Sequence, residues 1–355
     1  MHIVHVADIS DIPLSREAWN RLVSQNETNT LFLTHEWFSS WYDTFSVGHE
    51  LCLLLVYEGE NPIGFAPLVV CKHDNKHKTL QFAGYCNADY LDFVAPTSKK
   101  QVINLIFNYL VDEFNDWDRI LLYNIPSESS TSAYIEEACN RLNLPCLERN
   151  AINCPYLQIE GHQEEVDRLI NKYRNKRPFN YFSKQGELIF RRLSQEDIDK
   201  HLPVFFSQHI QRWEGTPFPS LFNNHLNQLL YKNVAQQFVD TDWLHFSVVE
   251  LDGKPISYHY GFDYDDKYYW YKPSFNTDYS AHSPGILMVR YLIESALIRQ
   301  RKELDFTIGD EPFKKRFTNS KRHNINLDVF RKKKTYWFHN TLFHASKIKR
   351  HVYKT

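Results

Sequence analysis

Two β-hairpin signatures, one in each half of the chain, constrain the fold more than any other feature of the sequence. In each, a four-residue turn joins two runs rich in β-forming residues: Gly59-Glu60-Asn61-Pro62 between 51–58 and 63–70, and Asp252-Gly253-Lys254-Pro255 between 245–251 and 256–264. Glycine suits such turns because it accepts positive φ angles without steric cost. A signature that recurs in this way indicates an internal repeat.

The same order of elements surrounds both hairpins. The first copy is expected at residues 2–7, 15–25 and 35–45 before its hairpin, and at 78–85, 90–94, 99–114, 119–125, 132–142 and 146–159 after it. The second copy is expected at 187–193, 196–212 and 222–237, then at 267–275, 284–302, 304–308, 312–317 and 324–330. This alternation of strands and helices predicts an α/β fold of two tandem sandwiches with mixed sheets. We expect domains at 1–160 and 187–340, a helical connector at 161–186 and a basic tail at 341–355.

Length and composition agree with two domains. The chain has 355 residues, more than one hydrophobic core usually holds, and 43% of them are apolar. The six cysteines form no Cys-x-x-Cys pair, which favours buried reduced thiols. No run is apolar enough for a transmembrane helix, and residues 1–8 lack the features of a signal peptide. We therefore expect a cytoplasmic protein without a transmembrane segment, whose oligomeric state the sequence leaves open.

The charges are unevenly distributed along the chain. Residues 299–355 hold 16 Lys or Arg against 5 Asp or Glu, although the net charge of the whole chain is only -2. This excess suggests that the C-terminal part meets an anion, such as a cofactor phosphate, an acidic glycan or nucleic acid. A solvated basic tail would explain it equally well.

The start of the helix expected at 284 carries the clearest chemical signal. Ser283 is a good N-cap, Pro284 suits the first helical position, and Gly285 leaves the backbone open to a close approach. The unpaired amides of a helix start and the positive end of its dipole attract anions. The preceding strand, 267–275, is aromatic and could pair its backbone with an extended ligand. Together these segments suit a pyrophosphate with a long amide arm, although most such helix starts are ordinary caps.

Five segments resemble a known family. They are 279–287 (YSAHSPGIL), 304–314 (LDFTIGDEPFK), 209–213 (HIQRW), 34–38 (THEWF) and 83–93 (AGYCNADYLDF). They are similar to the acetyltransferases associated with bacterial cellulose and exopolysaccharide biosynthesis, which belong to the GNAT superfamily of acyl-CoA-dependent acyltransferases. They are also similar to the Fem-type aminoacyl transferases, which are built on two tandem GNAT domains. The resemblance covers almost the whole chain.

The resemblance implies a donor and an acceptor. The C-terminal domain would bind acetyl-CoA or another acyl-CoA through Tyr271, Ser283, Gly285 and Ile286, without a metal. The N-terminal domain lacks a glycine near the start of helix 99–114 and would instead shape the acceptor groove. The implied acceptor is an amino sugar or another precursor of a surface polysaccharide. Residues 281–286 keep only one glycine of the usual GNAT pyrophosphate loop, so an aminoacyl donor stays open.

Acyl transfer needs a base for the acceptor proton and a cation for the developing oxyanion, and positioning can supply much of the rest. Asp305 alternates with Leu304 and Phe306 in a strand, so it could face a cleft as base, or it could form a salt bridge. Lys314 could bind the oxyanion or an acceptor phosphate. His259 alternates with small and polar residues, which suits either a cleft wall or a hydrogen-bonded core position. Asp310-Glu311, with no paired histidine, gives little metal signal.

Further residues are candidates for acceptor binding. His209, Arg212 and Trp213 share one helical face, where arginine could hold an anion and tryptophan could stack on a sugar ring. Simple packing of the same residues is the alternative. Asp89 or Asp92 could face the acceptor groove and bind an amine or hydroxyl.

Two other functions stay open at this stage. One is aminoacyl transfer from a charged tRNA to a cell-wall or lipid acceptor, which the basic C-terminal segment favours. The other is a non-catalytic carbohydrate-binding or scaffold role, which the 8 tryptophans and 21 tyrosines would suit.

Overall fold

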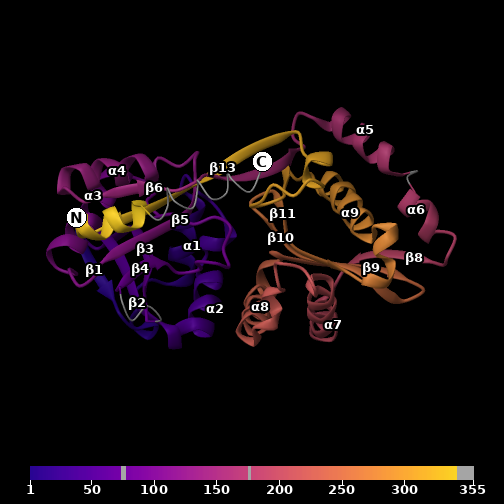
Figure 1. Cartoon of the computed structure of the whole chain (residues 1–355), viewed down its shortest axis with the longest axis horizontal. Coiled ribbons are helices and arrows are strands. Elements are labelled where there is room, and N and C mark those ends of the chain that lie inside the picture. The colour runs from indigo at the N-terminus through magenta and orange to yellow at the C-terminus, as the bar shows by residue number, and fades with distance from the viewer. Residues whose placement is uncertain (73–76, 175–176, 342–355) are drawn as a thin grey trace. The chain divides into compact units, whose positions relative to one another are not determined.

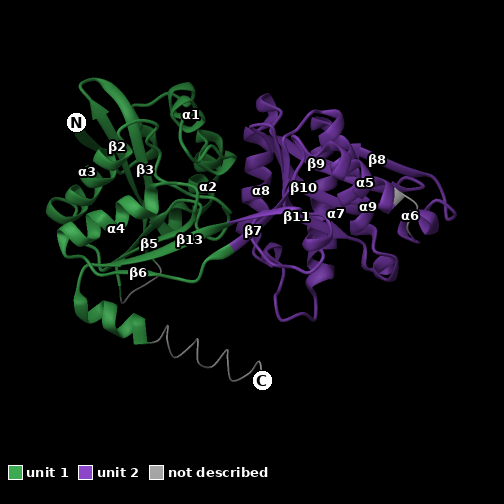
Figure 2. Ribbon diagram, turned by 90° about the horizontal axis from the view of Figure 1, so that it is seen from above, with its two compact units in different colours: residues 1–152, 323–355 green, residues 153–322 purple. Residues whose placement is uncertain are grey.

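The computed structural model describes residues 1–72, 77–174 and 177–341. The chain forms two compact units (Figure 2): unit 1 contains residues 1–152 and 323–355, and unit 2 contains residues 153–322. The strands belong to a large mixed sheet, and each unit contributes a mixed set of strands with helices on both faces (Figure 1).

Unit 1 has its strands in the order β1-β2-β3-β4-β5-β13, with β6 also pairing β13. The β4–β5 pair is parallel and the other pairs are antiparallel. The strands are β1 (His2–Val6), β2 (His49–Glu58), β3 (Asn61–Cys71), β4 (Thr79–Phe82), β5 (Arg119–Pro126), β6 (Cys146–Glu148) and β13 (Ser320–Phe330). The helices are α1 (Arg16–Ser24), α2 (His35–Phe45), α3 (Lys99–Asp112) and α4 (Thr131–Leu142).

Unit 2 repeats this plan in the order β8-β9-β10-β11-β12-β7, and its only parallel pair among the described strands, β11–β12, occupies the equivalent place. The strands are β7 (Ile152–Gln158), β8 (Leu188–Arg192), β9 (Leu244–Leu251), β10 (Lys254–Tyr264), β11 (Lys267–Phe275) and β12 (Glu303–Asp305). The helices are α5 (Gln163–Arg174), α6 (Arg177–Phe182), α7 (Gln195–Trp213), α8 (His225–Gln237) and α9 (Pro284–Ile298). Helices α7 and α8 cover one face of the sheet and α9 the other (Figure 1).

In each unit, the last strand of the order given above comes from outside the continuous repeat. Strand β7 precedes all the other elements of unit 2 in sequence, yet it pairs with β12. Strand β13 follows β12 in sequence, yet it pairs with β5 of unit 1. The observed units therefore differ from the expected boundaries, because residues 153–160 and the helical segment expected as a connector belong to unit 2, and residues 323–330 return to unit 1.

The expected repeat of two tandem α/β sandwiches is confirmed. Both hairpins, β2–β3 and β9–β10, form as the turn residues predicted. Segment 90–94, expected as a strand, forms only an isolated β-bridge, in which Val94 and Phe65 exchange two backbone hydrogen bonds. The Leu91 amide donates to the Asn124 carbonyl instead. Three of the cysteines, Cys52, Cys139 and Cys154, are buried, while Cys86 is exposed.

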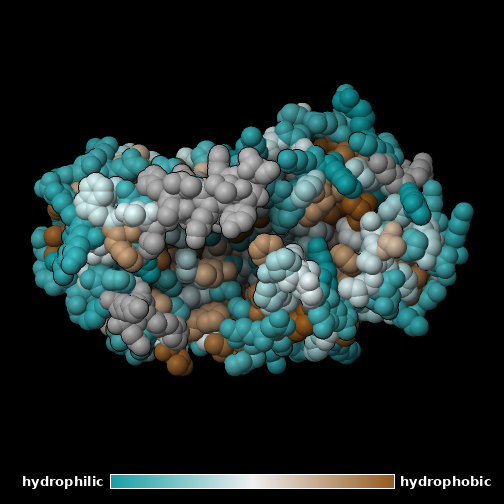
Figure 3. Space-filling model, in the orientation of Figure 1, coloured by the Kyte–Doolittle hydropathy of each residue, from teal (hydrophilic) through white to brown (hydrophobic). Residues whose placement is uncertain are grey.

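Unit 2 has a core that accounts for its helix positions. Buried residues of α9, β11 and β12, among them Met288, Trp270 and Leu304, pack with residues of α5 and α6. The visible surface is mostly hydrophilic, with hydrophobic residues showing over α9 (Figure 3). Within the described ranges, no helix combines the length and hydrophobicity needed to cross a membrane.

Candidate functional site

The parallel strands β11 and β12 of unit 2 pair over only three residues and then part. Lys267, Tyr268 and Tyr269 lie beside Glu303, Leu304 and Asp305. Beyond this point Thr307 adopts a left-handed φ of 53°, and its hydroxyl donates to the Trp270 carbonyl at 3.2 Å. The rest of β11, as far as Phe275, therefore leaves β12 and leads toward the start of α9.

The start of α9 is open. Ser283 is exposed, has φ 54°, and forms no side-chain cap. Pro284 has no N–H, so Gly285 supplies the first amide of the helix. A side chain built at Gly285 would find its nearest neighbour, Phe275 Cδ1, 4.0 Å away. The Ile286 amide is used internally, because it donates to the Ser283 carbonyl at 3.0 Å.

The last turn of α7 reaches this helix start through Phe275. The Arg212 guanidinium lies 4.7 Å from the centre of the Phe275 ring and 5.4 Å from that of Trp213, and it donates to the Pro273 carbonyl at 2.8 Å. Burial lowers the pKa of Arg212, an effect that the charge of Glu311 opposes. The buried indole N–H of Trp213 has no hydrogen-bond partner among the described residues. A bound ligand oxygen would satisfy such a donor.

His209 packs beside these residues without facing open space. Its Nδ1 lies 2.8 Å from the Ser220 hydroxyl, and its ring contacts Phe222 edge-on. Burial lowers the pKa of His209 to about 3, with the positive charges of Arg212 and Lys272 adding to the effect. The imidazole is therefore neutral near pH 7 and supports the turn that presents Arg212 and Trp213.

His259 lies in the core. Of the two positions that the sequence left open for it, a cleft wall or a hydrogen-bonded core position, the structure shows the second. It is 1% exposed, stacks on Trp270 with ring centres 4.8 Å apart, and accepts the Tyr271 amide at Nε2 over 3.3 Å. Burial lowers its pKa to about 3. Gly261 makes room for it, since a Cβ there would lie 1.9 Å from His259 Cε1. The backbone amide of Tyr271, expected to face a ligand, thus donates to His259.

Asp305 is also buried. Its Oδ1 accepts the Thr307 amide at 2.7 Å, and its Oδ2 pairs with the Arg322 guanidinium, which also pairs with Glu303 at 2.6 Å. The carboxylate is 0% exposed. Of the two interpretations of the strand pattern, the geometry matches the salt bridge, which fixes the turn where β11 and β12 part.

Lys314 is a buried clamp on the loop after β12. Its ammonium donates to the Ile308 carbonyl at 2.8 Å and pairs with Glu311 at 2.8 Å, although the residue is only 3% exposed. The pair lies over Gly309, where a Cβ would be 2.5 Å from the Glu311 carboxylate and where φ is +120°. Glu311 and Lys314 border a cavity of about 550 Å³.

Sequence reasoning missed Glu311 as a functional candidate. It weighed Asp310-Glu311 only as a metal site, and among the described residues no group of three or more metal-ligating side chains occurs. The available signal was a glycine followed by two acids and, three residues after Glu311, a lysine in a loop at the end of a strand.

Asp89 and Asp92, the candidates in unit 1, do not line an open groove. Asp89 is 4% exposed and Asp92 is 0% exposed. The carboxylate of Asp92 accepts from Thr28 at 2.6 Å, from Ser129 at 2.7 Å and from the Lys99 ammonium at 3.1 Å. Asp92 is therefore part of a closed polar cluster.

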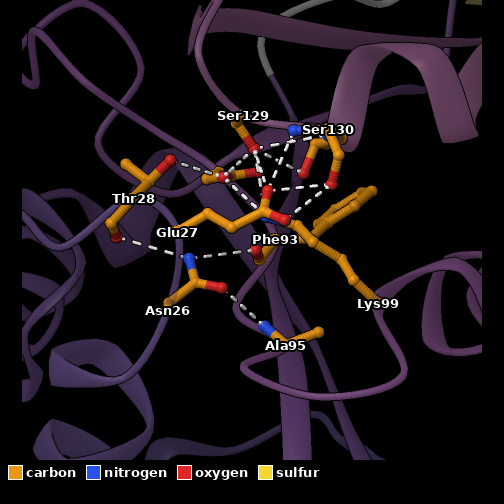
Figure 4. Close-up of polar contacts among 10 residues, drawn as sticks. Asn26, Glu27, Thr28, Phe93, Ala95, Lys99, Ser129 and Ser130 are labelled. Atoms are coloured by element: carbon orange, nitrogen blue, oxygen red, sulfur yellow. Dashed lines mark hydrogen bonds and ion pairs between the residues drawn. The ribbon is translucent and has the colours of Figure 1, made fainter.

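This cluster fills the start of α3. Lys99, the first residue of the helix, also reaches Glu27 at 3.2 Å, and Glu27 accepts the Ser130 amide at 2.9 Å (Figure 4). Ser98 precedes Lys99 with φ 53°, and its side chain does not cap α3. Ser283 precedes α9 with φ 54° and likewise forms no side-chain cap. The two helix starts are thus alike in backbone and opposite in contents.

The basic excess of the C-terminal segment is partly neutralised within unit 2. Arg299 and Arg301 pair with Asp263 at 3.1 and 2.6 Å, and Lys302 pairs with Asp266 at 3.1 Å. Residues 332–334 are exposed lysines. The expected tail at 342–355 lies outside the described residues.

Comparisons with known proteins agree with this geometry. Residues 164–315 match the model of the acetyltransferase (GNAT) domain, and no protein with a curated description matches the chain. Among solved structures, FemX is 12% identical with a TM-score of 0.62, covering 92% of this chain and 97% of its own.

Two further structures share the fold. L-PGS from Bacillus licheniformis is 11% identical with a TM-score of 0.52, covering 91% of this chain and 93% of its own. The C-terminal domain of a putative lysylphosphatidylglycerol synthetase from Agrobacterium fabrum is 9% identical with a TM-score of 0.50, covering 87% and 91%. The chain thus has a tandem GNAT-like fold.

Proposed function

We propose that this chain, whose residues 164–315 match a GNAT acetyltransferase domain, transfers an acyl group from acyl-CoA, with acetyl-CoA as the expected donor. The acceptor is the amine or hydroxyl of an amino sugar or another precursor of a surface polysaccharide, as the sequence resemblance implies. The observation that carries the proposal is the open start of α9 beside the parting strands β11 and β12.

The donor site fits the residues present. The amide of Gly285 and the dipole of α9 suit a pyrophosphate, and Ser283 and Ile286 flank it. Arg212 and the unpaired indole N–H of Trp213 offer further polar contacts at the same end of β11. The bound thioester would bring the electrophilic carbonyl carbon, and the protein would bind it and hold the acceptor in register.

The other predicted residues receive supporting roles in this proposal. Asp305 and its Arg322 partner keep the strands apart, His259 holds the Tyr271 amide, and Lys314 fixes the loop that follows β12. His209 supports Arg212 and Trp213. Asp89 and Asp92 stabilise unit 1, so the acceptor contacts are expected from unit 2.

Isothermal titration with coenzyme A tests the donor site. Gly285→Trp fills the open helix start and is expected to weaken binding at least 100-fold. Gly285→Ala should weaken it less than threefold, because the added Cβ meets its nearest neighbour at 4.0 Å. Lys100→Trp, at the equivalent second position of α3, is the matched control and should bind as wild type does. A folded wild-type protein that gives no heat with coenzyme A would refute the proposal.

Aminoacyl transfer from a charged tRNA is the second candidate. It is supported by the fold shared with a putative lysylphosphatidylglycerol synthetase and by the exposed lysines 332–334. Against it, several basic residues of the C-terminal segment are already paired with aspartates. Filter binding of charged and uncharged tRNA across salt concentrations separates the two, because phosphate contacts give a steep salt dependence. Capture of charged tRNA without coenzyme A binding would favour this candidate.

A further inference from the structure

A helix that follows strand β13 has an outer face that combines aromatic and basic side chains. It spans residues 333–341 and belongs to unit 1 (Figure 2). Its exposed residues, together with the residue just before it, are Lys332, Lys333, Lys334, Trp337, Phe338 and Thr341. Within the helix these residues are separated by three to four or seven to eight positions, or are neighbours in sequence, so they share one side of it.

The inner side of this helix packs against unit 1, which fixes the direction of the outer face. The rings of Tyr336 and His339 contact the ring of Phe330 at the end of β13, with ring centres 5.8 and 5.4 Å apart. These contacts anchor the helix through its inner side. They leave Trp337 and Phe338 directed away from the core of unit 1.

Two large aromatic side chains are therefore exposed next to each other. Trp337 is 63% exposed and Phe338 is 60% exposed. A single exposed apolar residue is common on a protein surface, but two adjacent aromatic residues beside lysines form an amphipathic surface. Tryptophan and phenylalanine are among the side chains that enter the boundary between lipid headgroups and acyl chains.

The charge of this part of the chain has one sign. Residues 331–355 contain eight Lys or Arg and no Asp or Glu. Lysines 332–334 are exposed and form no ion pair with the described residues, whereas Arg299 and Arg301 pair with Asp263. A cluster of lysines that no carboxylate neutralises attracts a negatively charged surface.

The sequence after residue 341 continues this combination of residue types. Apolar residues recur at every third or fourth position, namely Phe338, Leu342, Ala345, Ile348 and Val352. The basic residues among them and after them are Lys347, Lys349, Arg350 and Lys354. Contacts with RNA phosphates need only the positive charges, whereas a lipid surface uses both the charges and the regularly spaced apolar residues. The pattern therefore favours a membrane surface over RNA as the partner.

We propose that the outer face of helix 333–341 binds the surface of a membrane that contains anionic lipids. Trp337 and Phe338 enter the boundary between headgroups and acyl chains, and lysines 332–334 contact the lipid phosphates. The basic residues of 342–355 add to the attraction. This inference is independent of the proposed function, because it concerns where the protein binds and involves no residue of the donor site.

Co-sedimentation of the full chain with sucrose-loaded vesicles tests the inference. One set of vesicles contains phosphatidylcholine alone, and in the other about one third of the lipid is anionic phosphatidylglycerol. The chain should bind the anionic vesicles about tenfold more tightly or better, because each lysine near the surface adds to the attraction. Raising the salt concentration from about 0.1 M to about 0.5 M should weaken this binding, because salt screens the charges.

Variants of the outer face separate its two contributions. Trp337→Ser combined with Phe338→Ser should weaken binding to the anionic vesicles about tenfold or more, because two apolar contacts with lipid are lost. Lys333→Gln combined with Lys334→Gln should weaken it about tenfold. The matched controls are Phe218→Ser, at a residue of unit 2 that is 72% exposed, and Lys254→Gln, at an exposed turn. Both controls should bind the vesicles as the wild type does.

Tryptophan fluorescence locates the contact. The difference between the spectra of the wild type and of Trp337→Phe isolates the emission of Trp337, and this emission should shift to shorter wavelength when anionic vesicles are added. An unchanged difference spectrum would contradict the entry of Trp337 into lipid. Circular dichroism checks that each variant is folded, which is expected because all the substituted side chains are exposed.

Three results would overturn the inference. The first is a wild type that does not bind anionic vesicles. The second is vesicle binding that the aromatic and lysine variants leave unchanged. The third is a different partner for the same face: tRNA capture in a filter assay, or a dimer in solution, that these variants abolish while vesicle binding is unaffected. Coenzyme A binding enters none of these results, so the failure of the proposed function would be seen separately.

Discussion

Helices α3 and α9 begin with the same backbone conformation but with different side chains. Ser98 and Ser283 precede them with left-handed φ angles of 53° and 54°, and neither serine caps its helix with its side chain. In unit 1 the next residue is Lys99, whose buried ammonium is bound by Asp92 and Glu27. In unit 2 the next residues are the buried Pro284 and then Gly285, where an added Cβ would meet only Phe275, at 4.0 Å.

The difference shows how a duplicated fold can divide its tasks. A helix start attracts negative charge whether or not a ligand is available. In unit 1 the chain supplies its own carboxylates and a lysine, and these groups neutralise one another. In unit 2 a proline and a glycine supply no side chain that could take the place of a ligand. The start of α3 in unit 1 thus holds a structural cluster, and the start of α9 in unit 2 is the candidate donor site.

The strongest test of this division removes the central carboxylate of unit 1. Asp92→Ala leaves the Lys99 ammonium buried without its main partner and should lower the free energy of unfolding of unit 1 by about 3 to 5 kcal/mol. Glu137→Ala breaks the half-exposed ion pair between Lys100 of α3 and Glu137 of α4. This change should lower the free energy of unfolding by less than about 1 kcal/mol. Hydrogen exchange followed by mass spectrometry resolves unit 1 from unit 2. Equal costs for the two variants would contradict the assigned role of the cluster.

Acid should affect unit 2 before unit 1. The pKa values of His209 and His259 are lowered to about 3, so below about pH 6.5 the unfolded chain binds protons that the folded chain does not. Stability is then lost as the pH falls, by about 1.4 kcal/mol per pH unit for each histidine. Burial also lowers the pKa of His245 in unit 2 well below its usual value. Between about pH 8 and pH 5.5 the three histidines together should cost unit 2 about 4 kcal/mol.

Hydrogen exchange across this pH range, again read unit by unit, checks the acid effect. His209→Gln should remove about a third of it, because His245 and His259 would still respond. In unit 1, His5 and His35 have pKa values lowered by burial but are only partly buried, so a smaller effect is expected there. If unit 1 lost stability at a higher pH than unit 2, the predicted order of the two units would be wrong.

The smallest expected effect concerns the outer edge of the cluster. Burial raises the pKa of Glu27, but hydrogen bonds from Ser130 and the charge of Lys99 outweigh it, so that the net pKa is lowered. The stabilisation is present above the ordinary value near 4.5 and is lost as the pH falls through the folded-state pKa. Glu27→Gln should therefore cost less than about 1 kcal/mol near neutral pH, because the side chain is half exposed, and nothing in acid. Urea unfolding of the wild type and of Glu27→Gln, at neutral pH and in acid below the pKa of Glu27, measures this difference in the free energy of unfolding.

Much of the fold could be predicted from local pattern, because each element carries its own signal. Strand β11 and helix α2 match their expected ranges, and both hairpins follow from Gly59 and Gly253 in their turns. The partners of β7 and β13 could not be predicted, since pairing between distant strands leaves no periodicity in either segment. The expected boundaries therefore followed sequence continuity instead of the sheet.

The candidate site was harder to predict, because polar residues on a strand face either a cleft or a buried partner with the same alternation. Asp305 and His259 both have buried partners, Arg322 and the Tyr271 amide. The position of the helix start at Pro284 could be predicted, since it depends on local backbone chemistry, but the expected N-cap was wrong, because the Ser283 side chain does not cap the helix. Glu311 could not be predicted, because its position depends on Lys314 meeting it in space.

The exchanged closing strands have a consequence for how the protein is made. Unit 1 begins at the first residue, yet its sheet lacks β13 until almost the entire chain has left the ribosome. While unit 2 is being synthesised, strand β5 of unit 1 therefore still lacks its partner β13. An unpaired strand of this kind can pair wrongly with other chains. A premature stop codon shortly before residue 320 would harm the beginning of the protein more than its end. Neither half of the gene, expressed alone, would encode a complete sheet.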